Sequence, residues 1–227
     1  MSETKEKNQY LIPGAIIIAG MLIGLGMWQR GEAPSQETVD TAVTEITEGL
    51  LPITDEDHLL GSKDADVFLI VFSDYRCGYC GLYHETVKEI FAEYDGRLAW
   101  VYRHAPYQPG GKEVAVASEC VTEQLDREAF WDFSDRIFKE QRQVGADWYR
   151  STIEDMGGNV EEFEACIVSG RYDELIARHT MNAQSLGVQG TPYSVLLTRE
   201  GEMVKFSGAQ PIENVRIFVE RALRTLE

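Results

Sequence analysis

The sequence predicts an α/β domain in which a helical insert separates a β-α-β half from a β-β-α half, preceded by a transmembrane helix. Three observations support this order. First, an apolar run of strand length is followed by a helical pattern and a second strand. Second, every plausible segment in the middle of the chain has helical spacing. Third, two short strands precede an amphipathic closing helix. With 227 residues, 44% of them hydrophobic, the chain can form one medium-sized domain plus an anchor.

The composition argues against one class of partner and favours one type of compartment. The formal charge is −17, and no cluster of lysine and arginine is evident in the sequence. Because binding to phosphates needs such a cluster, we expect no nucleic-acid partner. The four cysteines, an even number, suit a protein of an oxidising compartment.

The amino end predicts a membrane anchor. No charged side chain occurs between Lys7 and Arg30, and the apolar stretch in this window is long enough to cross a hydrocarbon core. We expect a cytoplasmic tail at 1–9, a transmembrane anchor at 10–28 and a flexible acidic linker at 29–57. A cleaved secretory signal and a buried helix of a soluble fold are the alternatives. With either an anchor or a signal, the remainder lies on the periplasmic or extracellular side.

The first half of the domain consists of two strands and the helix between them. Residues 66–73 form an apolar run, 78–94 carry apolar residues on one helical face, and 97–103 are β-branched and aromatic. Gly96 suits the left-handed position that ends the helix. A crossover of this length implies a parallel pair of strands with a right-handed connection.

The second half follows a helical insert at about 105–187. The strands are expected at 193–198 and 203–206 with a turn at Glu200-Gly201 between them, and Pro211 suits the first position of the closing helix. Within the insert, Asp147 is a possible helix N-cap. The insert helices are expected at 112–124, 128–141, 147–156, 160–169 and 172–186.

Cys77 and Cys80 form a CxxC pair where the first strand passes into its helix. A helix N-terminus offers unpaired N–H groups that stabilise a thiolate on the first cysteine, and the thiolate is the reactive form. We therefore expect dithiol–disulfide exchange, with Cys77 as the attacked sulfur and Cys80 in reserve. The alternatives are an inert disulfide and a zinc site that includes His84, although zinc would need a fourth ligand.

The chain resembles the DsbA family of thioredoxin-like oxidoreductases, in particular its membrane-anchored branch. The resemblance covers 58–227 and depends on FSDYRCGYC, on YRHAP, on the helix at 115–120 and on GVQGTPYSVLL. It implies a thioredoxin-like fold and a cis Thr191–Pro192 peptide that faces the CxxC pair and presents backbone to a bound peptide. It also implies exported protein thiols as substrates and a quinone-linked membrane oxidase, of the DsbB or vitamin K epoxide reductase type, as recycling partner. No cofactor is expected, since the dithiol itself carries two electrons.

The residues between the cysteines modify the expected strength of oxidation. Gly78 and Tyr79 stand where the strongest oxidants of the family have proline and histidine, and Thr191 before the proline also occurs in reductase or isomerase relatives. We therefore expect moderate oxidising power. A disulfide reductase or isomerase of the same fold and a non-catalytic, membrane-tethered client-binding factor remain the alternative functions.

Other residues have two possible roles each. Asp74 either accepts the proton of Cys80 through water or caps a turn. Arg76 either adds positive potential beside Cys77 or is solvated. Cys120 and Cys166 either form a structural disulfide in the insert or pack as free thiols.

The histidines are expected to have minor roles. His104 follows the second strand and is expected in a loop, where a modest electrostatic contribution to the site is the alternative. His58 and His179 are expected at the surface.

Overall fold

The computed structural model describes residues 49–94 and 96–227. Within this part of the chain, every helix is too short or too polar to cross a bilayer. The predicted cytoplasmic tail at 1–9, the anchor at 10–28 and most of the 29–57 linker lie outside the described residues.

The centre of the domain is a five-stranded sheet with the order β1-β3-β2-β4-β5. β2 and β3 are parallel, whereas the other neighbouring pairs are antiparallel. The strands are β1 (His58–Leu60), β2 (Val67–Ser73), β3 (Leu98–His104), β4 (Tyr193–Thr198) and β5 (Met203–Ser207). The helices are α3 (Gly78–Glu93), α4 (Gly111–Gln124), α5 (Arg127–Lys139), α6 (Ala146–Asp155), α7 (Val160–Val168), α8 (Asp173–Ser185) and α9 (Ile212–Arg224).

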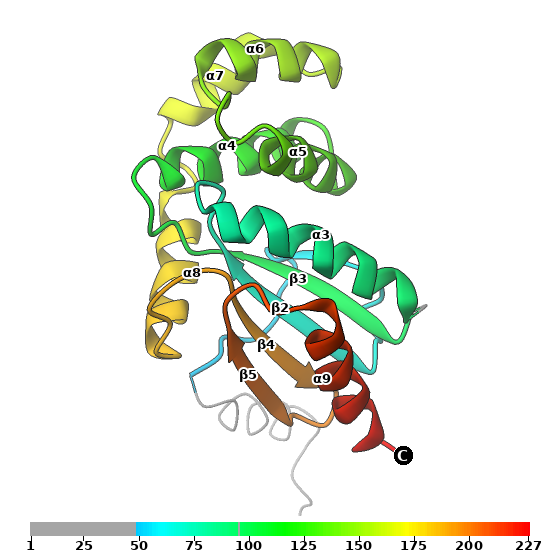
Figure 1. Cartoon of the computed structure of the whole chain (residues 1–227). Coiled ribbons are helices and arrows are strands. Elements are labelled where there is room, and N and C mark those ends of the chain that lie inside the picture. Colours follow the sequence, from blue (N-terminus) through cyan, green and yellow to red (C-terminus); the bar gives the residue numbers. More distant parts are fainter. Residues whose placement is uncertain (1–48, 95) are drawn as a thin grey trace, which may run out of the picture. The chain divides into compact units, whose positions relative to one another are not determined.

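β2 is buried on both faces, which explains why its sequence is apolar without interruption. Val67, Leu69 and Val71 pack with residues of α3 and α9. Ile70 and Phe72 point to the opposite face and pack with residues of α8 and of the segment before β1. The alternation places one helical layer on each side of the sheet, with α3 beside α9 and α8 opposite (Figure 1).

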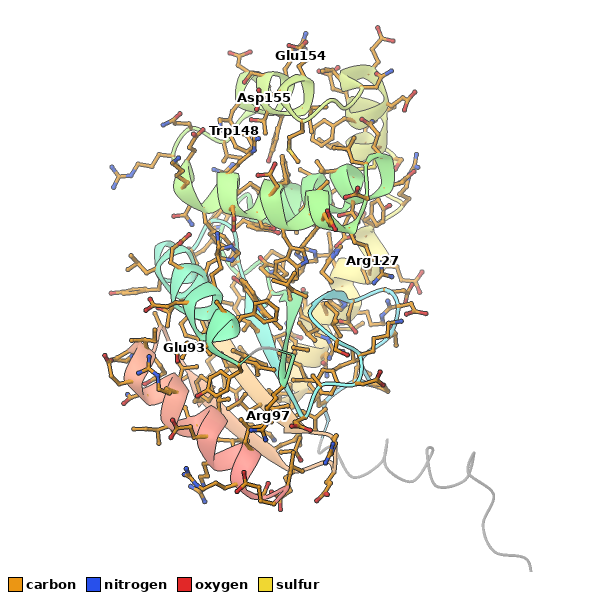
Figure 2. The ribbon with its side chains drawn as sticks, turned by 90° about the vertical axis from the view of Figure 1, so that its right-hand side faces the viewer. Glu93, Arg97, Arg127, Trp148, Glu154 and Asp155 are labelled. Carbon is orange, nitrogen blue, oxygen red and sulfur yellow. A yellow bond between two sulfur atoms is a disulfide. The ribbon has the colours of Figure 1, made fainter. Side chains whose placement is uncertain are left out.

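An ion pair joins the two helices of the first layer at the carboxyl end of α3. Figure 2 shows Glu93 at this end of α3, beside α9, and its carboxylate accepts two hydrogen bonds from Arg216 at 2.7 and 2.8 Å. Both side chains are partly exposed, so this pair contributes little to stability compared with the apolar contacts beneath it.

The helical insert comprises α4 to α8; its first four helices pack around a core of aromatic side chains, whereas α8 also packs on the sheet. Phe133 of α5 and Trp148 of α6 lie with their ring centroids 5.6 Å apart, and α6 is the part of the insert that lies far from the sheet (Figures 1 and 2). A disulfide between Cys120 of α4 and Cys166 of α7 crosslinks the insert. The same core includes Tyr75 and Cys80, so the insert packs directly against the CxxC segment.

The start of the domain differs from the prediction. Residues 49–57 were expected to belong to a flexible linker, yet Leu50 is only 4% and Asp57 only 3% exposed. β1, which we did not predict, follows at His58–Leu60 and pairs with β3. A three-residue strand is too short to show a periodic pattern, and its place is decided by pairing with a strand some forty residues later.

Several helix termini also differ. The N-cap of α6 is Gly145, with Asp147 inside the first turn, and Pro211 is the N-cap of α9 rather than its first residue. α5 ends at Lys139, two residues before the predicted end, and this releases Gln141 into the following loop. Helix ends depend on backbone contacts that periodicity does not report.

Candidate active site

The two cysteines lie at the first turn of α3 in different environments. Cys77 is the N-cap of the helix and is partly exposed, whereas Cys80, one turn further, is 1% exposed. The carbonyl oxygen of Cys77 accepts hydrogen bonds from the N–H groups of Cys80 at 3.1 Å and of Gly81 at 3.3 Å. The helix therefore begins at Cys77, and the backbone N–H groups of its first turn lie near this sulfur.

The pKa values of the two thiols are shifted in opposite directions. A hydrogen bond with Cys80 and the backbone N–H groups of Cys80 and Tyr79 lower the pKa of Cys77 from 9.0 to about 5, although partial burial opposes the shift. Burial, together with the hydrogen bond to Cys77, raises the pKa of Cys80 above the ordinary value for a thiol. At neutral pH, Cys77 is a thiolate and Cys80 remains protonated.

The Thr191–Pro192 peptide is cis and lies against Cys77. The Sγ of Cys77 is 3.3 Å from the carbonyl oxygen of Thr191. Beside it, an open pocket of about 420 Å³ is lined by the cis-proline segment and by Ser207 and Gly208. The arrangement leaves one sulfur accessible next to backbone groups that can bind an extended peptide.

The side chain between the cysteines is exposed. Tyr79 is 69% exposed, and Leu82 on the next turn is 67% exposed. Gly78 has open space where a side chain would begin. The rim of the site is thus apolar and unobstructed, although the chain carries a large negative charge.

Asp74 has the contacts of a capping residue. One of its carboxylate oxygens accepts from the N–H of Arg76 at 2.8 Å, and the other accepts from the N–H of Gln108 at 2.6 Å. A Cβ on Gly111 would lie 2.7 Å from Asp74 Oδ1, so only glycine fits at the start of α4. Burial raises the pKa of this carboxyl group, but the backbone donors oppose that shift. These contacts favour the turn-capping interpretation of Asp74.

Arg76 and Gln141 connect the CxxC segment to the insert. The guanidinium of Arg76 donates to the carbonyl oxygens of Gln141 and Val144, so the interpretation of Arg76 as a solvated side chain is wrong. The Gln141 amide donates to the carbonyl oxygens of Tyr75 and Cys77. Gln141 could not be identified from the sequence, because a glutamine in a polar loop belongs to no motif.

The predicted surface position of His58 is wrong, and His104 ends β3 rather than lying in a loop. Both histidines are buried and bind Glu119, with His58 Nε2 2.8 Å and His104 Nε2 2.6 Å from the same oxygen, Oε1. Burial opposes ionisation of Glu119, yet the two histidines outweigh it and lower the pKa of the carboxyl group. β1 brings His58 to Glu119 from a distant part of the sequence, which local patterns cannot indicate.

These three residues are also the one group of metal-ligand type among the described residues. Their donor atoms lie within 4.8 Å of one another. However, the Nε2 of each histidine already contacts one carboxylate oxygen, so these two atoms are satisfied without an ion, whereas His104 Nδ1 is buried without a hydrogen-bond partner among the described residues. The zinc alternative at the CxxC pair gains no support from His84, whose Nε2 binds Asp135 at 2.6 Å.

His179 is buried as well, contrary to its predicted surface position. Burial and the neighbouring His104 lower the pKa of His179 to about 3. Its neighbour Asp57 binds Arg103 through two hydrogen bonds of 2.7 and 3.0 Å, and Arg103 also donates to Asn182 at 2.9 Å. A buried ionic network therefore underlies the carboxyl end of β3.

Comparisons with known proteins agree with this fold. The family model described as Thioredoxin matches residues 54–208, more than half of the chain. This chain belongs to the thioredoxin family. Among solved structures of this fold, Wolbachia pipientis alpha-DsbA1 is similar with a TM-score of 0.69, covering 80% of this chain and 99% of that chain at 20% identity. The resemblance to the DsbA-type branch is thus confirmed at the level of the fold.

Curated relatives are similar to part of this chain. The Na(+)/H(+) antiporter NhaA of Herminiimonas arsenicoxydans is 30% identical over 136 residues, which make up 60% of this chain and 21% of the antiporter. The probable disulfide bond formation protein D of Bacillus cereus is 28% identical over 145 residues, 59% of this chain and 66% of that protein. The chain spans about a fifth to a quarter of the length of the antiporters that it matches.

Proposed function

We propose that this thioredoxin-family chain is a thiol–disulfide oxidoreductase that forms disulfides in exported proteins through Cys77 and Cys80. The observation that carries the proposal is the unequal pair of sulfurs. Cys77 is partly exposed with a pKa lowered to about 5, and Cys80 is buried with a raised pKa. Such a pair provides one good leaving group and one reserve thiol.

The exchange begins with the Cys77–Cys80 disulfide. A client thiolate attacks the sulfur of Cys77, a mixed disulfide forms, and Cys80 leaves and takes up a proton. A second client thiolate then attacks the client sulfur of the mixed disulfide and releases Cys77 as a thiolate. The client loses two electrons and two protons, and the protein gains the electrons as its dithiol. An oxidant must then restore the disulfide, and we assign this step to a quinone-linked membrane oxidase of the DsbB or vitamin K epoxide reductase type.

The direction of exchange follows from the low pKa of Cys77. Stabilising the thiolate stabilises the reduced form, which makes the disulfide form more oxidising. Tyr79 cannot add the charge that a histidine would, so we expect a moderate rather than an extreme potential. A potential near that of thioredoxin, about −270 mV, would instead favour a reductase or isomerase.

We further propose that the domain works outside the cytoplasm, tethered by residues 10–28. The uncharged apolar window between Lys7 and Arg30 supports the tether. The disulfide between Cys120 and Cys166 supports an oxidising compartment. Protection of the domain from protease in cells whose outer envelope is permeable to the protease, or loss of the first thirty or so residues from the extracted protein, would contradict the tethered arrangement.

The test of the chemistry uses the full chain in detergent with reduced, unfolded ribonuclease as the client. We expect the wild-type disulfide form to restore ribonuclease activity and Cys77→Ser to be inactive. Cys80→Ser, with Cys77 first converted to its mixed disulfide with glutathione, should release glutathione and accumulate a mixed disulfide with the client. A matched variant, Gln143→Met, changes an exposed side chain and keeps wild-type activity. If Cys77→Ser retains the activity, Cys77 is not the reacting sulfur and the proposal fails.

A further inference from the structure

The loop between α5 and α6 is hydrogen-bonded to the segment that carries Cys77. The side-chain amide of Gln141 donates to the carbonyl oxygen of Tyr75 at 2.9 Å and to that of Cys77 at 3.0 Å. In the other direction, the guanidinium of Arg76 donates to the carbonyl oxygens of Gln141 at 3.2 Å and Val144 at 3.1 Å. The insert thus holds the CxxC segment by hydrogen bonds to its backbone.

The Cys77 carbonyl has a special place in α3 because it accepts the first hydrogen bonds of the helix. The N–H groups of Cys80 and Gly81 donate to it from within the helix, and Gln141 adds a donor from outside. The peptide unit that carries this carbonyl also carries the N–H of Gly78. Fixing the carbonyl therefore fixes the direction of the first helical N–H groups, which lie around the sulfur.

We propose that Gln141 is a positioning residue for disulfide exchange: its amide holds the Cys77 carbonyl, and through it the first turn of α3, in the orientation that directs backbone N–H groups at the reacting sulfur. This inference rests on the proposed function. A glutamine suits the role because one amide nitrogen supplies two uncharged donors, one for each carbonyl. A glutamate of the same shape supplies only acceptors and would oppose both carbonyl oxygens.

The experiment uses the reduced full chain and measures the rate of iodoacetamide alkylation of Cys77 from pH 3 to 10. The variants are Gln141→Met and Gln141→Glu, and the matched controls are Gln143→Met and Gln143→Glu, at an exposed position of the same loop. In Gln141→Met we expect the midpoint of the alkylation profile to rise by about half to one pH unit, the effect of losing one hydrogen bond. In Gln141→Glu we expect a larger rise, and in the Gln143 variants a change of at most about 0.2 units.

Thermal unfolding of each variant separates positioning from simple attachment of the insert. If both Gln141 variants melt earlier but keep the wild-type alkylation midpoint, Gln141 only fastens the insert and the inference is wrong. It is also wrong if Gln143→Glu raises the midpoint as much as Gln141→Glu, since added charge alone would then explain the rise. A wild-type midpoint near 9 would instead contradict the proposed function. If Gln141→Glu fails to fold, the alkylation midpoint of the uncharged Gln141→Met variant still tests the inference.

Discussion

The lowered pKa of Cys77 predicts how the stability of the reduced protein depends on pH. In the unfolded chain this thiol titrates near 9.0, and in the folded protein near 5. Because the folded pKa is the lower one, the thiolate contribution is complete above pH 9, shrinks as the pH falls, and is lost below about pH 5. The disulfide form has no such titration and serves as an internal reference.

The size of this change in the free energy of unfolding follows from the linkage between proton binding and folding. Each pH unit between the two pKa values contributes about 1.4 kcal/mol, so the reduced form would gain about 2.7 kcal/mol from pH 4 to pH 7. Because Cys77 is partly exposed, solvent screening reduces the expected gain to about 1–2 kcal/mol. Carboxylates elsewhere titrate in both redox forms, so their contribution cancels in the difference.

The assay is urea unfolding of the reduced and disulfide forms at pH 4, 5, 6 and 7. We expect the free energy of unfolding of the reduced form to rise relative to that of the disulfide form by about 1–2 kcal/mol over this range. The free energy of unfolding of Cys77→Ser should show no such rise relative to that of the wild-type disulfide form. A difference between the two redox forms that stays constant from pH 4 to 7 would refute a thiolate at Cys77 and the argument built on it.

Two further predictions concern the buried charges and the crosslink. Asp57→Asn leaves the buried Arg103 without its carboxylate partner, so urea unfolding should show a loss of about 3 kcal/mol; a loss below about 1 kcal/mol would mean that the pair is solvated. The double variant Cys120→Ala/Cys166→Ala opens a crosslink between cysteines 46 positions apart and should lose up to about 4 kcal/mol, with the alkylation profile of Cys77 unchanged. A shifted profile would show that the crosslink also shapes the site.

The sequence predicted the elements that a local pattern specifies. The first strand was expected at 66–73 and is found at Val67–Ser73, because a continuous apolar run of this length is typical of a strand buried on both faces. The first helix was expected at 78–94 and is found at Gly78–Glu93. The hairpin strand at Tyr193–Thr198 has the predicted bounds, and the cis peptide before it was expected from the resemblance.

The buried polar residues could not be predicted in the same way. Charged and histidine side chains are most often exposed, so His58 and His179 were assigned to the surface and Asp57 to a linker. His58 and Asp57 are buried because a partner from another part of the chain satisfies each of them: Glu119 for His58, and Arg103 for Asp57. Such contacts depend on which strands pair. The pairing that brings these residues together is that of β1 with β3, and β1 has only three residues.

The chain carries a net charge of −17, which by itself would raise the pKa of any thiol. The pKa of Cys77 is nevertheless lowered, so local groups must outweigh the overall charge. Distance explains this result: charges farther away than about 8–10 Å are screened by salt, whereas the Cys80 thiol, which hydrogen-bonds to the sulfur, and the backbone N–H groups at the start of α3 adjoin it. Their effect depends on direction as well as distance. The contacts that fix the backbone around Cys77 are therefore as important to the chemistry as the cysteines, and the Gln141 amide, supplied by the insert, belongs to them.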